Sequence, residues 1–212
     1  MSQSLHPRAR TGRLAVLAFT LLGPAVALAH PGHAAHADFL SGLRHPLTGL
    51  DHLSALFALG LWAEWLGGRL RRTLPLAVLV AMAIGALLAA ALPVPAGQAG
   101  PALEVAAVDQ LLAASLLLMG LLTAYLSRLP RAATLPLASA FALFHGVAHG
   151  AELPADGSRL TWLAGMLAGS LLLLVAGSLI TRWLQRRDPR PVRQRQLGGL
   201  VAAVGLALLL GG

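Results

Sequence analysis

Histidines and carboxylates that can bind a metal ion occur in two short stretches of an otherwise apolar chain, HPLTGLDH (residues 45–52) and FHGVAHGAE (144–152). The candidate ligands there are His45, Asp51, His52, His145, His149 and Glu152. Imidazole and carboxylate groups suit Ni, Co, Zn, Mn or non-haem Fe better than Cu(I). The chain has no Cys, which excludes disulfides and thiolate ligands. We therefore expect a site for a divalent metal ion.

The second stretch predicts a chelating helical face. His145 and His149 are four residues apart and Glu152 follows three residues later, so all three lie along one side of a helix. At about 1.5 Å per residue from the outer end of each predicted span, His52, Asp109 and His145 lie roughly 9 to 12 Å deep. A charged group near the centre of a span costs about 2.5 to 3.5 kcal/mol. Their shared depth therefore indicates a functional site.

The first stretch leaves two arrangements open. His45 and His52 share a helical face, but they differ by about 10 Å in rise, which is too far for one ion on a regular helix. Either the helix is broken in its first turn, which Pro46 and Gly49 allow, or the two histidines serve successive sites. Asp51 is either a ligand or an acceptor that orients an imidazole ring.

Composition predicts the elements that must position these groups. The chain has 212 residues, of which 57% are hydrophobic and 11% are charged, as in a membrane protein. A helical span needs about 20 apolar residues. Six stretches fit or nearly fit, at 46–66, 74–92, 101–126, 133–150, 160–181 and 197–211. We predict an all-α integral membrane protein, a bundle of six transmembrane helices after a cleaved signal peptide.

Arginine placement predicts the orientation. All 16 basic residues are Arg, and eleven of them follow the first, third and fifth spans, against Arg44 and Arg159 on the other side. Cytoplasmic loops are enriched in such residues, so both mature termini are expected in the periplasm. The clusters indicate topology rather than a nucleic-acid-binding face. Without Lys there is no phosphate-binding loop, so we expect no nucleotide as a partner.

The N-terminal residues predict three divisions of the chain. Residues 1–29 have an Arg-containing start and an apolar run that ends in Ala27-Leu28-Ala29, typical of a cleaved signal peptide, with an uncleaved span as the alternative. Residues 30–45 form a His-rich periplasmic segment, and residues 46–212 form the transport domain. The segment's candidates for capturing metal ions are His30, His33 and His36.

Two further features concern packing. Glu64, near the inner end of the first span, is predicted to be an interfacial charge that faces Arg69 or Arg72. Gly165 and Gly169 form a GxxxG pair, which allows close approach of another helix. We interpret this pair as packing within one bundle, with a dimer interface as the alternative.

HPLTGLDH and FHGVAHGAE resemble the two signature stretches of the HupE/UreJ proteins, which are membrane permeases for nickel and, in some members, cobalt. The resemblance covers essentially the whole mature chain. It implies that the six candidates in the two stretches are metal ligands. Asp109 precedes Ser115 by six residues and fits an acidic position of the family that more usually holds Glu, with Glu104 as the rival.

The resemblance implies high-affinity import of Ni²⁺, or also Co²⁺, across the bacterial inner membrane to supply a hydrogenase or urease. The protein would act by secondary transport or facilitated diffusion, with membrane lipid as surroundings, no permanently bound cofactor and no enzymatic activity. One alternative is an intramembrane metal-dependent hydrolase, although Gly146 stands where the HExxH motif has its catalytic Glu. A second is a b-type haem protein with two axial histidines.

Overall fold

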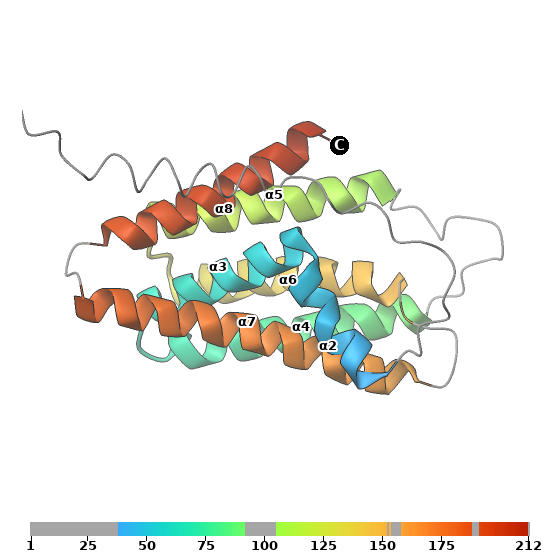
Figure 1. The fold of residues 1–212 in the computed structure, drawn as a ribbon. Coiled ribbons are helices and arrows are strands. Elements are labelled where there is room, and N and C mark those ends of the chain that lie inside the picture. The colour runs from blue at the N-terminus through green and yellow to red at the C-terminus, as the bar shows by residue number, and fades with distance from the viewer. Residues whose placement is uncertain (1–37, 92–104, 152, 154–157, 188–190, 212) are drawn as a thin grey trace, which may run out of the picture. The chain divides into compact units, whose positions relative to one another are not determined.

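The computed structural model describes residues 38–91, 105–151, 153, 158–187 and 191–211, with the side chains of 105–109 and 151 excepted. All regular secondary structure in these ranges is helical, as predicted (Figure 1). The helices are α2 (Phe39–Thr48), α3 (Leu50–Leu66), α4 (Leu70–Ala91), α5 (Val105–Ala124), α6 (Arg131–Ala151), α7 (Arg159–Arg187) and α8 (Val192–Gly211).

Four helices are long and apolar enough to cross a membrane, at Leu70–Ala91, Arg131–Gly150, Arg159–Arg187 and Val192–Gly211. They correspond to the second, fourth, fifth and sixth predicted spans. The apolar part of α5 described here, Gln110–Ala124, is shorter. Membrane crossing by the first and third predicted spans stays a prediction. The predicted signal peptide lies outside the described residues.

The first predicted span is not one helix from residue 46. α2 ends at Thr48 and α3 begins at Leu50, with Gly49 between them in an extended conformation (φ −79°, ψ 119°). A Cβ atom at position 49 would lie 2.9 Å from His52 Nδ1 and 3.0 Å from Asp51 Oδ1. Glycine therefore allows the chain to turn close to these two side chains. Of the two arrangements left open by the sequence, the structure has the broken helix.

The sequence did not predict α2, and most of its residues fell in the predicted His-rich segment, residues 30–45. The Asp38 carboxylate accepts a hydrogen bond from the Ser41 backbone N–H at 2.7 Å. In return, the Ser41 hydroxyl oxygen accepts one from the Asp38 backbone N–H at 3.1 Å. This reciprocal cap satisfies two backbone donors that a helix start leaves free. The bond from the Ser41 amide also lowers the pKa of the Asp38 carboxyl.

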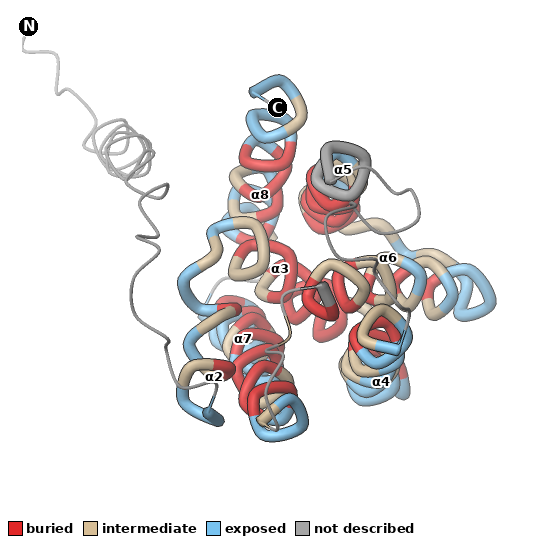
Figure 2. Tube along the Cα trace, turned by 90° about the vertical axis from the view of Figure 1, so that its right-hand side faces the viewer, coloured by how far each residue is buried: buried red, intermediate tan, exposed pale blue. Residues whose placement is uncertain are grey.

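Close packing against α7 fixes the place of α2 (Figure 2). A Cβ atom at Gly165 would overlap the Phe39 carbonyl oxygen, and one at Gly169 would meet that of Leu43. On α2, a Cβ atom at Gly42 would overlap the Trp162 carbonyl oxygen. The GxxxG pair therefore packs within the bundle, as we interpreted it, and holds α2 where its histidine can reach the interior.

α3 lies among the other helices, and its second half is held by side chains from several of them (Figure 2). Ser178 of α7 donates to the Gly60 carbonyl oxygen at 3.1 Å. The indole N–H groups of Trp62 and Trp65 donate to the carbonyl oxygens of Ser127 and Leu126 at 2.9 and 3.0 Å. This end of α3 is therefore fixed to α7 and to the connection between α5 and α6.

The predicted environment of Glu64 is wrong. Its side chain is only 2% exposed, and its two oxygens lie 3.1 Å from Arg71 Nε and 2.9 Å from Arg182 Nε. Arg71 stands in the first turn of α4, and α7 brings Arg182 back to the same end of the bundle. The carboxylate is thus buried between two guanidinium groups instead of facing Arg69 or Arg72 at the surface.

Candidate metal site

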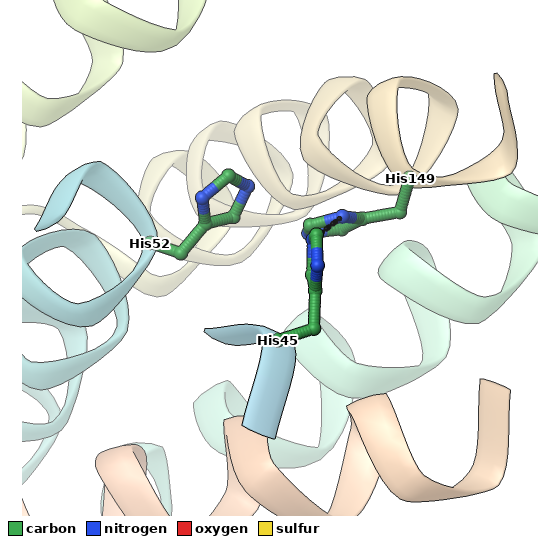
Figure 3. A group of neighbouring side chains, drawn as sticks. All are labelled: His45, His52 and His149. Carbon is green, nitrogen blue, oxygen red and sulfur yellow. Dashed lines mark hydrogen bonds between the residues drawn. The ribbon is translucent and has the colours of Figure 1, made fainter. Parts of the chain in front are cut away.

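Three imidazoles from three helices meet near the break between α2 and α3 (Figure 3). His45 comes from α2, His52 from α3 and His149 from α6, and one nitrogen of each lies within 4.8 Å of the others. The ring of His149 lies 4.7 Å from that of His45 and 4.4 Å from that of His52, measured between centroids. Residues 104 positions apart therefore form one cluster, which we call the three-histidine site.

The nitrogens of His45 and His149 already have the spacing of two ligands on one ion. His45 Nε2 and His149 Nδ1 are 3.0 Å apart and share a hydrogen bond. Two nitrogens about 2.1 Å from an ion, at right angles, are also separated by about 3.0 Å. A cation bound to both atoms would lie off the line that joins them, so each ring would have to turn toward it as the shared proton leaves.

Asp51 orients the third imidazole. Its Oδ1 lies 2.9 Å from His52 Nδ1. A carboxylate only accepts at this contact, so the Nδ1 atom of His52 carries the proton and Nε2 of the neutral ring holds the lone pair. His52 Nε2 is buried and makes no hydrogen bond within the described part of the chain. Asp51 thus takes the orienting position, one of the two roles that the sequence left open for it.

His145 lies beside the three-histidine site but outside it. Its ring is 5.7 Å from that of His52 at a right angle, and the residue is 6% exposed. Its Nδ1 donates to the Phe141 carbonyl oxygen at 2.9 Å, since a carbonyl can only accept. The lone pair of the neutral ring is therefore on Nε2.

Several candidates cannot be placed from the described residues. Asp109 belongs to α5, but its side chain is outside the described part. Glu104, Glu152 and the predicted capture residues His30, His33 and His36 lie outside the described residues altogether. Their assignment as metal-binding residues stays a prediction.

Sequence reasoning missed one neighbour of the site. Trp162 of α7 packs against His45, with 5.2 Å between ring centroids. It lies three residues before Gly165, within the small-residue contact that holds α2. No signal in the sequence separates this tryptophan from an ordinary apolar residue of a span.

Gly146 serves helix packing. A Cβ atom at this position would overlap the Met82 carbonyl oxygen of α4. The glutamate that a hydrolytic HExxH motif needs would have no room there while α4 and α6 keep this contact. The structure therefore provides no catalytic base at the position where the hydrolase alternative requires one.

Comparison with known proteins identifies the family of this chain. The family model described as "HupE / UreJ protein" matches residues 17–208. The chain belongs to the HupE/UreJ family. It is 38% identical over 202 residues to Protein HupE of Rhizobium leguminosarum bv. viciae, covering 95% of this chain and 97% of that protein. No solved structure matches.

The HupE/UreJ family is a transporter family associated with nickel and cobalt. Family membership and the four long apolar helices indicate a membrane protein of the permease type. The three-histidine site brings together nitrogen atoms of a type that can bind such a cation.

Proposed function

We propose that this protein imports Ni²⁺, and also Co²⁺, across the bacterial inner membrane by secondary transport or facilitated diffusion. One observation carries the proposal: imidazoles from three helices, His45, His52 and His149, converge with their nitrogens within 4.8 Å. Neutral imidazole suits these borderline metals, and no thiolate is present to favour softer ones. The family's association with nickel and cobalt agrees with this donor set.

The three-histidine site would bind the cargo near the outer end of the bundle. The ion binds His45 Nε2 and His149 Nδ1. His52 adds its Nε2 atom, the ring nitrogen that does not contact Asp51. Because the three rings come from separate helices, a bound ion links α2, α3 and α6. Release then requires these helices to separate, which is how a transporter can couple binding to a conformational change.

The opposite end of α3 would face the cytoplasm. Glu64 lies there with Arg71 and Arg182, which belong to the arginine clusters that follow the first and fifth predicted spans. This orientation agrees with the enrichment of basic residues on the cytoplasmic side. The ion therefore enters near the histidines and leaves near the arginines.

The membrane potential is a sufficient driving force. For a doubly charged ion it contributes about 4.6 kcal/mol per 100 mV, which corresponds to roughly a thousandfold accumulation at equilibrium. The chain contains no Lys and thus no phosphate-binding loop for nucleotide hydrolysis. Uptake should therefore collapse when the potential is removed and should persist when ATP alone is depleted.

The test is uptake of radioactive nickel at submicromolar concentration by a bacterium that lacks its own nickel transporters. Cells expressing the wild-type chain should accumulate nickel, with cobalt as the strongest competitor and manganese as a weak one. Cells with an equal amount of membrane-inserted His52→Ala protein should not. Absence of uptake by inserted wild-type protein would contradict the proposed function.

A further inference from the structure

Two pairs of helices cross in the same way, α3 with α7 and α4 with α6. Four glycines make these crossings, Gly60 facing Gly177 and Gly85 facing Gly146. A Cβ atom at any of the four would overlap a carbonyl oxygen of the other helix, and that oxygen always belongs to the residue three positions before the facing glycine. A Cβ atom at Gly177 would also lie 2.8 Å from the backbone nitrogen of Leu61. The equivalent atom at Gly85 would lie 2.9 Å from that of Val147. The two crossings are therefore built alike.

α5 and α8 meet through a third reciprocal glycine contact. A Cβ atom at Gly120 would overlap the backbone nitrogen of Ala202. One at Gly205 would overlap that of Leu117, and each nitrogen belongs to the residue three positions before the opposite glycine. All three contacts correspond when α3, α4 and α5 are matched in order with α6, α7 and α8. Because α6 runs parallel to α4, and α4 returns from α3 after a short turn, the two sets of helices form an inverted repeat.

The repeat gives α3 and α6 equivalent faces. Helical spacing places one set of residues on each face, His52, Leu56, Leu59 and Ala63 on α3 and Ala138, Ala142, His145 and His149 on α6. Because the two helices run in opposite directions, the histidines of both faces lie at one end and Ala63 and Ala138 lie at the other. These two alanines are buried, with exposures of 0% and 1%. The two faces thus extend from the three-histidine site to a buried apolar end, where Ala63 precedes Glu64.

The glycine crossings divide the helices around the site into two groups (Figure 2). In the first group, α2 and α3 pack on α7 with their backbones in contact, and in the second α4 packs on α6 in the same way. His45 and His52 belong to the first group and His149 belongs to the second. At the site itself the two groups meet through imidazole rings. An ion bound to all three rings would therefore join two units that are each closely packed.

We propose that α4 and α6 move as one unit against α2, α3 and α7, and that the ion is released inward when the faces of α3 and α6 separate at Ala63 and Ala138. The inference rests on the proposed function and adds the step by which the ion leaves. In transporters built from inverted repeats, rocking of one unit against another exchanges an outer opening for an inner one around a fixed site. The equivalent crossings in the two groups allow the same exchange here. Water then reaches the inner ends of both faces.

Single cysteines can test this movement because the chain has no Cys. Ala63→Cys and Ala138→Cys each place a thiol at the inner end of one face. Thr181→Cys is the matched control, because Thr181 is also 0% exposed and donates to the Leu61 carbonyl oxygen at 3.3 Å within the first group. Nickel uptake by each variant would first be measured in cells. Inside-out membrane vesicles, with Ni²⁺ enclosed or absent, would then be treated with a membrane-impermeant maleimide, which reaches only the cytoplasmic face.

Enclosed Ni²⁺ should raise the labelling rates of Ala63→Cys and Ala138→Cys about 5-fold or more, as expected when an open state of about 1 to 10 per cent becomes a major one. Labelling of Thr181→Cys should stay slow with and without the ion. If both alanine variants label no faster than this control in vesicles from cells that take up nickel, the proposed movement is overturned alone. An equal response of all three variants would overturn it too. Inserted wild-type protein that takes up no nickel would overturn the proposed function as well.

Discussion

The two ends of α3 hold their ionisable side chains in opposite ways. At the end of the helix, buried Glu64 has one guanidinium nitrogen within 3.1 Å of each carboxylate oxygen. At its start, His52 lies in a group of imidazoles whose nitrogens face one another within 4.8 Å. The negative charge of Glu64 is compensated by Arg71 and Arg182. The second group includes Asp51, whose Oδ1 lies 2.9 Å from His52 Nδ1.

This difference separates a structural ion cluster from a binding site. A buried carboxylate paired with two arginines has its charge already compensated, and it joins α3 to α4 and α7. The imidazoles of the second group share a hydrogen bond between His45 and His149, which a cation bound to both rings would replace. We therefore expect changes at the start of α3 to affect metal binding and changes at its end to affect stability.

The largest effect is expected at the imidazole cluster. His149→Ala removes the ring that contacts both other histidines, so nickel uptake should fall 100-fold or more, on the order expected when a metal ligand is lost. Uptake of submicromolar radioactive nickel, normalised to inserted protein, measures this. Glu64→Gln is the comparison and should retain uptake per folded molecule. Equal uptake by His149→Ala and wild-type protein would remove His149 from the site.

Removal of both arginines should be the most destabilising change at the other end. Arg71→Ala combined with Arg182→Ala leaves a 2% exposed carboxylate without a partner, which costs about 3 to 5 kcal/mol for a buried charge. Glu64→Gln should cost less, because the two arginines are 43% and 44% exposed and can be solvated. Denaturant unfolding in mild detergent compares them. The reverse order would contradict a structural role for this cluster.

Asp51→Asn tests the orienting role of the carboxylate. The variant keeps the shape of the side chain but loses the charge that favours the Nδ1–H form of His52, so nickel affinity should fall about 10- to 100-fold. Calorimetric titration of purified protein with Ni²⁺ measures the change. Asp38→Asn, an exposed helix cap, is the matched control and should bind nickel like the wild type. An unchanged affinity in Asp51→Asn would show that the contact with His52 is incidental.

A smaller effect is expected where α2 packs on α7. Gly165→Ala places a methyl group against the Phe39 carbonyl oxygen, so α2 must shift at a cost of about 1 to 3 kcal/mol, and His45 moves with it. Nickel affinity should fall a few-fold. Gly199→Ala, with no atom within 4 Å of the added methyl, should leave affinity unchanged. If both variants bind nickel equally well, the position of α2 does not matter for binding.

The sequence predicted the imidazole cluster better than the helices that build it. Counting residues from the outer end of each span placed His52 and His145 at one depth, and Pro46 with Gly49 indicated a possible break before His52. Spacing grouped His145 with His149, whereas the structure joins His149 to His45 and His52 and leaves His145 beside them. The break itself, which brings His45 to His149, depends on packing of α2 against α7 and could not be chosen from spacing. The Asp38 and Ser41 pair is a readable signal for the start of α2.

The partners of Glu64 were beyond sequence reasoning for a different reason. Arg182 follows Glu64 by 118 residues, and only the return of α7 to the same end brings the two together. Such contacts between distant segments appear only when the helices are assembled.

The most direct test of the central claim is anomalous diffraction at the nickel absorption edge from crystals of the nickel-loaded protein. We predict the strongest peak between His45, His52 and His149, about 2.0 to 2.1 Å from one nitrogen of each ring. A strongest peak elsewhere, or crystals soaked in nickel that show no peak among these three histidines, would contradict the account.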